Sequence, residues 1–181
     1  MTTALLLIDI QNDYFPGGKM ELVGSPQAAR QARRLLDHFR QAGLPIIHVQ
    51  HIATRPGATF FLPGTDGAKT HAEVQPLPGE TVVVKHHPNS FRETPLLETL
   101  RSLQVDQLAI GGMMTHMCVD ATTRAAADFG FECLIAGEAC ATRDLRFGGQ
   151  VIPAAQVHGA FLAALNDAYG KVVVVDEITA L

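Results

Sequence analysis

The sequence contains no tryptophan, only two tyrosines, and few charged side chains, which make up 18% of its residues. Its Lys and Arg side chains number 14 against 18 Asp and Glu, giving a formal net charge of −4. Proteins that bind nucleic acid present a basic surface to the phosphates, and this chain has no excess of basic residues to build one. We therefore expect no nucleic-acid partner.

Cysteine is scarce as well. The three cysteines, Cys118, Cys133 and Cys140, are odd in number, and no pair of them has the CxxC spacing. A disulfide framework or a cysteine zinc site is therefore not expected, and free thiols in a reducing compartment fit the pattern better.

Long apolar runs are missing too. The first apolar run is short, has no basic flank and ends at Asp9, which matches neither a secretory signal peptide nor a membrane span. We expect a cytoplasmic protein with no membrane partner. The length of 181 residues, 47% of them hydrophobic, suits one domain with a full core. No repeat or linker interrupts the chain, which predicts a single domain over residues 1–181.

Short runs rich in Val, Ile and Leu recur along the chain and alternate with helical patterns. The predicted strands are residues 4–9, 45–50, 81–85, 107–112, 131–137 and 171–176, and the predicted helices are residues 25–43, 94–104, 116–130 and 153–170. Strands without polar alternation are typical of sheets buried on both faces. The order of elements therefore predicts an α/β fold in which helices cover both faces of a parallel sheet.

Two segments are too long and irregular to be simple connections. Residues 51–80 are rich in Gly and Pro, and residues 137–149 are shorter but similarly irregular. Long loops in compact domains are usually functional lids or oligomer contacts. The paired Phe60 and Phe61 in the first segment require burial somewhere.

The polar side chains at the strand ends are the candidate site, because parallel sheets bind ligands beyond the carboxyl ends of their strands. Asp9 follows the first strand, Lys85 ends the third, and Cys118 lies just beyond the fourth. A carboxylate, an amine and a thiol are the parts of nucleophilic catalysis. The spacing of these residues along the chain does not show that they meet.

Cys118 taken alone allows two interpretations, a reactive nucleophile or an inert buried residue. It precedes helix-forming sequence, and a helix start or a nearby cation lowers the pKa of a thiol and favours the reactive thiolate. Unpaired N–H groups of the preceding turn would then stabilise an oxyanion. The alternative is an inert buried cysteine, the commoner fate of a cysteine in an apolar setting. We assign that role to Cys133 and Cys140.

Three segments together resemble a known family. They are "DIQNDYF" from Asp9, "KHHPNSF" from Lys85 and "GGMMTHMCVDATTRAAADFG" from Gly111, followed by "GEACAT" after the fifth strand. In this order they resemble the isochorismatase-like cysteine hydrolases, which include nicotinamidases, N-carbamoylsarcosine amidohydrolase and ureidoacrylate amidohydrolase. The resemblance implies a Rossmann-like three-layer sandwich with a six-stranded parallel sheet.

The resemblance also implies an Asp, Lys, Cys triad. Asp9 would accept the thiol proton, Lys85 would support charge, and Cys118 would attack an amide carbon to give a thioester that water hydrolyses. A non-proline cis peptide bond would fall between Met113 and Met114. The oxyanion would be bound by the backbone N–H groups of Met114 and Cys118.

By the same resemblance, four side chains would contact the substrate, namely Gln11, Tyr14, Met113 and His116. Nicotinamidases hold a metal through an Asp-x-His pair, but here Val49 stands at the aspartate position. His51 and His71 alone fall short of the usual three ligands, so we expect no metal and no cofactor.

The family includes more than one chemistry. Isochorismatases proper act on a vinyl ether and often lack the nucleophilic cysteine, so Cys118 favours hydrolysis of a C–N bond in a small amide, ureide or carbamoyl compound. The alternatives are vinyl ether hydrolysis and a catalytically silent ligand-binding protein of the same fold. Because family members commonly form homodimers or homotetramers, we expect one of these here.

Overall fold

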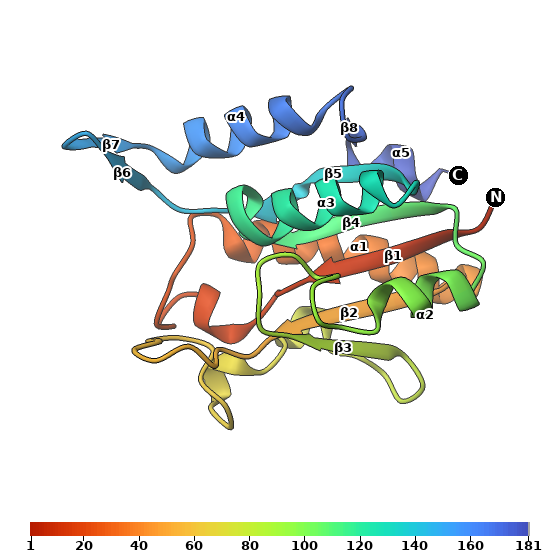
Figure 1. Ribbon diagram of the computed structural model, residues 1–181, viewed down its shortest axis with the longest axis horizontal. Helices are drawn as coiled ribbons and strands as arrows, with labels where there is room; N and C mark the ends of the chain where they lie inside the picture. Colours follow the sequence, from red (N-terminus) through yellow and green to blue (C-terminus); the bar gives the residue numbers. More distant parts are fainter. Residues whose placement is uncertain (181) are drawn as a thin grey trace.

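The computed structural model describes residues 1–180 and is built on one central sheet (Figure 1). Six parallel strands form it in the order β3-β2-β1-β4-β5-β8. Their bounds are β1 (Thr3–Ile8), β2 (Ile46–His51), β3 (Thr81–Lys85), β4 (Gln107–Met113), β5 (Glu132–Ala141) and β8 (Lys171–Val173). Each overlaps one of the six strands predicted from the sequence.

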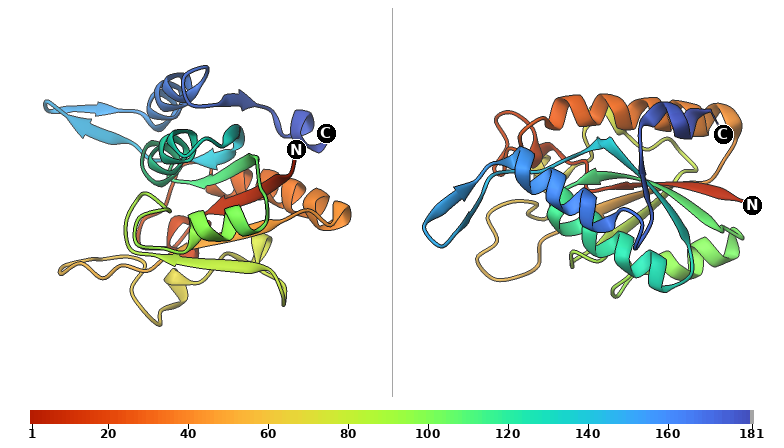
Figure 2. Two further views of the ribbon diagram at one scale, coloured as in Figure 1. Left: turned by 45° about the vertical axis from the view of Figure 1, so that its right-hand side comes forward. Right: turned by 90° about the horizontal axis from the view of Figure 1, so that it is seen from above.

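Helices cover both faces of this sheet, as the view from above shows (Figure 2, right). On one face lie α1 (Ser25–Ala42) and α5 (Val175–Thr179), and on the other lie α2 (Leu96–Ser102) and α3 (Asp120–Asp128). The helix α4 (Ala154–Leu165) packs beside α3 and β8. The predicted α/β three-layer sandwich is confirmed.

The side chains of β1 explain why both faces are covered. Leu5 and Leu7 belong to the apolar core beneath α1, whereas Leu6 and Ile8 belong to the core beneath α2 and α3. Successive side chains of a strand point to opposite faces, so a strand without polar alternation must be buried on both.

The order of the strands reverses between β1 and β4. The chain adds β2 and β3 on one side of β1, and β4, β5 and β8 on the other. Gly112 of β4 lies opposite Ile8 of β1, with φ of 149°. A Cβ atom at Gly112 would lie 2.2 Å from the carbonyl oxygen of Ile8, so only glycine permits this close approach.

In the second half of the chain, two predicted strand ends are wrong and one hairpin was missed. β5 continues to Ala141 through residues that were predicted irregular, and the last strand ends at Val173, where α5 follows. A hairpin of β6 (Leu145–Phe147) and β7 (Gln150–Ile152) was missed, although Gly148 and Gly149 both have positive φ and form its two-residue turn. The hairpin projects from the body (Figure 1), and the side chain of Phe147 is exposed.

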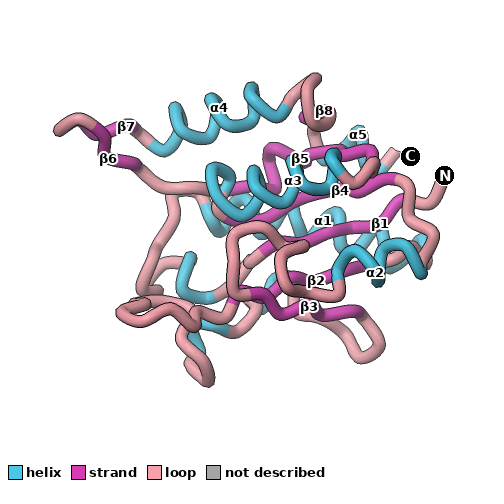
Figure 3. Tube along the Cα trace, in the orientation of Figure 1, coloured by secondary structure: helices cyan, strands magenta, loops and turns pink. Residues whose placement is uncertain are grey.

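The long loop after β2 packs against the carboxyl ends of the strands, away from the two termini (Figure 3). Its short 3-10 turns η2 (Asp66–Ala68) and η3 (Ala72–Val74) lie near η1 (Asn12–Tyr14) and α1, respectively. Phe61 is buried against Tyr14, with 4.6 Å between ring centroids, and its N–H donates to Asp13 at 2.7 Å. Within residues 1–180 we find no helix with the length and apolarity to cross a membrane.

Candidate active site

Three side chains from separate strand ends meet in the interior. Asp9 directly follows β1, Lys85 is the last residue of β3, and Cys118 lies in the turn after β4. The Nζ atom of Lys85 is 2.7 Å from Asp9 Oδ2 and 3.3 Å from Cys118 Sγ. All three side chains are buried. The structure therefore supplies the contact that sequence spacing left open.

The ammonium group of Lys85 lies near four hydrogen-bond acceptors but has only three N–H groups to donate. Besides Asp9 and Cys118, it lies 3.0 Å from His51 Nδ1 and 3.0 Å from the carbonyl oxygen of His87. Burial lowers the pKa of Lys85, but the negative charge of Asp9 and the hydrogen bonds to Asp9 and Cys118 outweigh burial and raise it overall. Lys85 is therefore a cation that can redistribute its three N–H groups among four acceptors.

The thiol of Cys118 is held in its protonated form. Burial raises its pKa well above the usual range, the negative charge of Asp9 adds to this, and Lys85 offsets only part of it. The net direction is opposite to the lowering that the sequence predicted from a helix start or a cation. Burial also raises the pKa of Asp9, against the attraction of Lys85. Asp9 is thus a stronger base than an exposed carboxylate and is placed to take the thiol proton.

The turn that carries Cys118 is irregular. The Met113–Met114 peptide bond is cis, as the family resemblance implied. A π-helical turn, Thr115–Val119, follows it, so regular α3 begins only at Asp120, four residues later than predicted. The N–H groups on either side of Cys118, those of Met117 and Val119, donate to the Met114 carbonyl at 3.0 and 3.3 Å.

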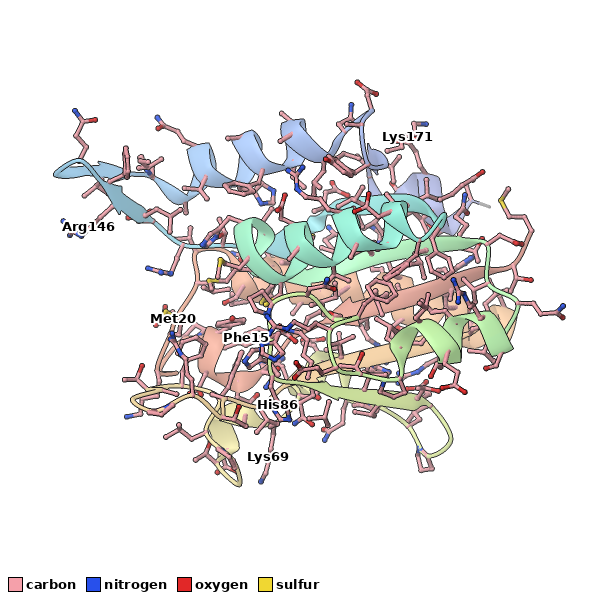
Figure 4. All side chains as sticks on the ribbon, in the orientation of Figure 1. Phe15, Met20, Lys69, His86, Arg146 and Lys171 are labelled. Atoms are coloured by element: carbon pink, nitrogen blue, oxygen red, sulfur yellow. The ribbon has the colours of Figure 1, made fainter. Side chains whose placement is uncertain are left out.

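A cavity of about 330 Å³ opens above Cys118. Its walls are largely aromatic and sulfur-containing, formed by Tyr14, Phe60, Phe61, Met114 and Met117. The loop after β2 supplies further walls through Ala53, Thr54 and Ala58. Polar groups at the cavity come from Arg55, His51, His86 and His87. Figure 4 shows His86 at the end of β3, near the central group of side chains.

The residues predicted to contact substrate divide into two groups. Of the four, Tyr14 lines the cavity, whereas Gln11, Met113 and His116 are not among its lining residues. Met113 is fully buried in the core beneath α1. His116 lies 2.5 Å from Thr142 Oγ1 and packs against Phe161.

Gln11 positions the end of β2. Its side chain accepts the His51 N–H at 2.7 Å and donates to the carbonyl oxygens of His51 and Ala68 at 2.9 and 2.8 Å. It is buried. The side-chain amide is therefore occupied by backbone partners, and it fixes His51 instead of facing a substrate.

The site contains a set of atoms that resembles a metal centre. Asp9, His51 and Cys118 each offer one ligand atom, all within 4.8 Å of one another. However, the Lys85 ammonium lies within 3.3 Å of all three residues and takes the position of a bound cation. His71 is held elsewhere, stacked on Phe15 with ring centroids 3.6 Å apart.

Comparison with known proteins assigns the chain to a family. The family model of the isochorismatase domain matches residues 3–176. The chain belongs to the isochorismatase family. The isochorismatase-family protein YddQ of Bacillus subtilis, itself uncharacterized, is 52% identical over 95% of this chain and 96% of its own length. A crystal structure of an Oleispira antarctica protein assigned to the isochorismatase hydrolases is 55% identical, with a TM-score of 0.96 over 99% of this chain and 97% of that one.

Two relatives of this isochorismatase-family protein carry the name of an activity. Streptothricin hydrolase of Streptomyces noursei is 35% identical over 91% of this chain and 59% of its own length. Ureidoacrylate amidohydrolase of Stutzerimonas stutzeri is 30% identical over 67% of this chain and 62% of its own length. The family is therefore one of hydrolases, and its members differ in substrate.

Proposed function

We propose that this isochorismatase-family protein is a cysteine hydrolase that cleaves a C–N bond of a small amide, ureide or carbamoyl compound. The observation that carries the proposal is the placement of Lys85 between Asp9 and Cys118, with Cys118 lining a largely apolar cavity. A nucleophile, a base and a fixed cation in contact are the minimal set for acyl transfer through a thioester.

The reaction begins with the thiol proton. Asp9 takes the proton from Cys118 as the sulfur attacks the carbonyl carbon, and Lys85 turns an N–H toward the developing thiolate. The carbonyl oxygen becomes an oxyanion, bound by the backbone N–H groups of Met114 and Cys118. The protonated Asp9 then gives its proton to the leaving nitrogen, so that ammonia or an amine departs.

Water completes the cycle by attacking the thioester. Asp9, again a carboxylate, accepts a proton from the water, the C–S bond breaks, and the thiolate of Cys118 regains its proton. The products are an acid, or a carbamate when the substrate is a ureide. Lys85 remains protonated throughout, which agrees with the direction of its raised pKa.

The test is turnover of a panel of small carboxamides, ureido acids and carbamoyl amino acids, measured by ammonia release. Cys118→Ala should reduce turnover by about a thousandfold or more, because no other group at the site supplies the nucleophile. Cys133→Ala is the matched control, since Cys133 is a buried thiol in β5. It should stay active, and both Cys133→Ala and the wild type should give a thioester adduct by mass spectrometry, whereas Cys118→Ala should not.

The alternatives make different predictions. A vinyl ether hydrolase would consume isochorismate and keep that activity in Cys118→Ala. A silent binding protein would bind panel members without releasing ammonia. Full activity of Cys118→Ala on an amide would refute the thioester mechanism.

A further inference from the structure

His51 is a polar side chain of the cavity that is held through both its backbone and its ring. It is the last residue of β2, and Gln11 binds both its N–H and its carbonyl group. Its ring nitrogen Nδ1 lies 3.0 Å from Lys85 Nζ, and the residue lines the cavity. Backbone and ring are thus both fixed before a ligand arrives.

The contact with Lys85 determines where the imidazole carries its proton. An ammonium group has no lone pair and can only donate, so Nδ1 of His51 must accept. In a neutral ring the single proton then lies on Nε2. Burial, followed by the positive charge of Lys85, lowers the pKa of His51 to about 3, so the ring stays neutral near pH 7.

The Nε2–H group is available to a ligand. Within the described part of the chain, residues 1–180, Nε2 has no hydrogen-bond partner and is not among the buried polar atoms that lack one, so it remains accessible. Among the cavity-lining residues there is no Asp or Glu. The cavity therefore offers hydrogen-bond donors and aromatic walls, and it offers no carboxylate to a cationic group.

We propose that the His51 Nε2–H group binds a hydrogen-bond acceptor on the acyl part of the substrate and thereby selects the substrate class. That class, which rests on the proposed function, is small, flat amides and ureides that carry an acceptor such as a ring nitrogen, a carbonyl oxygen or a carboxylate. A ring nitrogen of His51 lies within 4.8 Å of Cys118 Sγ, and both residues line the cavity, so one small substrate can reach both groups.

Matched pairs of substrates test this selection. Pyridine-3-carboxamide and benzamide differ only in a ring nitrogen, and ureidoacetate and isobutylurea differ only in a carboxylate against an isopropyl group of similar shape. We expect the acceptor-bearing member of at least one pair to have a kcat/KM about tenfold to a hundredfold higher. A preference confined to the first pair identifies a neutral acceptor, and one confined to the second identifies an anionic acceptor with help from Arg55.

Two substitutions separate substrate binding from support of Lys85. His51→Asn keeps an acceptor near Lys85 but loses the donor that reaches the cavity, so the preference within a pair should fall to about threefold or less. His51→Gln places an N–H near the position of Nε2, and the preference should largely survive. If His51→Asn lowers kcat/KM equally for both members of a pair, His51 has only a structural role and the proposal is overturned.

Nuclear magnetic resonance of 15N-labelled histidine decides the tautomer without any turnover. Between pH 5 and pH 8, His51 should be neutral and protonated on Nε2, and this proton should shift when pyridine-3-carboxamide or ureidoacetate binds to Cys118→Ala. An Nδ1–H tautomer, an imidazolium near neutral pH, or no shift with either bound probe would overturn the proposal. Binding through His51 without turnover of any amide would uphold it and refute the hydrolase function.

Discussion

At the scale of single residues, Asp9 has two opposite effects on Cys118: it disfavours the free thiolate, and it is the base that can remove the thiol proton. Its negative charge raises the pKa of the thiol, as burial also does, and only Lys85 acts in the opposite direction. The same Asp9 carboxylate is the base of the candidate site that can remove the proton from the Cys118 thiol. A thiol that ionises only when its proton is transferred is protected from reaction with solutes in the empty cavity.

The substitution Asp9→Asn separates these two effects. Without the negative charge, Lys85 acts on Cys118 unopposed, so the pKa of the thiol should fall and iodoacetamide alkylation should begin at lower pH than in the wild type. Amide turnover should nevertheless drop by about a thousandfold, because the base is gone. Peptide mass spectrometry measures the alkylation, with the buried Cys133 as internal reference. If the pH midpoint of Cys118 alkylation in Asp9→Asn is unchanged or higher than in the wild type, the charge of Asp9 does not raise the pKa of the thiol.

At the scale of elements, the site exists because β1 and β4 are neighbours. Strand order reverses between them, so the turn after β4 and the residue after β1 converge at one edge of the sheet. Asp9 has φ of 52°, in the left-handed region, which turns the chain sharply after β1. Gly112 allows β4 to lie against the Ile8 backbone, and this contact sets the starting position of the turn to Cys118.

Replacing Gly112 with Ala should therefore destabilise the fold itself. The new Cβ atom would meet the Ile8 backbone, at a φ that disfavours side chains, and we expect a loss of about 3 kcal/mol or more in the free energy of unfolding. Gly159→Ala is the matched control. Gly159 lies within α4 with open space around it, and alanine there should stabilise by about 0.5–1 kcal/mol. Urea unfolding of the two variants checks the contrast, and equal stabilities would contradict it.

At the scale of the whole molecule, the long loop is joined to the body by an ion-pair network. Glu80 accepts hydrogen bonds from Arg40 of α1 at 2.7 and 2.9 Å, and its carboxylate lies 2.9 Å from His48 Nε2 of β2. The bonds from Arg40, together with those from Leu77 and His48, lower the pKa of Glu80 from 4.5 to about 2, although burial opposes them. The end of the loop is thereby tied to both α1 and the sheet.

This network should make stability depend on pH in a defined window. A folded-state pKa below the unfolded value contributes stability that is complete above pH 4.5 and is lost as the pH falls toward 2. Glu80→Gln should lower the free energy of unfolding by about 2 kcal/mol at pH 7, and the gap to wild type should close between these pH values. Glu98→Gln, at an exposed position of α2, is the control. If the difference in unfolding free energy between Glu80→Gln and the wild type does not change with pH, the lowered pKa of Glu80 is refuted.

The homodimer or homotetramer expected from the family resemblance stays a prediction. The hairpin of β6 and β7 extends beyond the rest of the molecule, with Arg146 near its tip (Figure 4). Phe147 and Val151 are exposed on it. Light scattering of the purified protein measures the oligomeric state directly.

The sequence alone determined the layout of the chain. Apolar runs without alternation specified six buried strands, because a strand covered on both faces admits no polar side chain in its middle. The family resemblance supplied Asp9, Lys85 and Cys118 together with the cis bond at Met113. The elements that were missed are short. The two-glycine turn was a sequence signal for the hairpin of β6 and β7. Strands of three residues, however, are too short to show a recognisable hydrophobic pattern.

Tertiary structure alone decided the geometry and electrostatics of the candidate site. Strand order places residues 9, 85 and 118 in contact, and burial reverses the direction in which the pKa of Cys118 was expected to move. Gln11 supports the backbone of His51, and His51 lines the cavity beside Lys85. These outcomes depend on desolvation and on hydrogen bonds between residues distant along the chain, and neither is encoded in local sequence pattern.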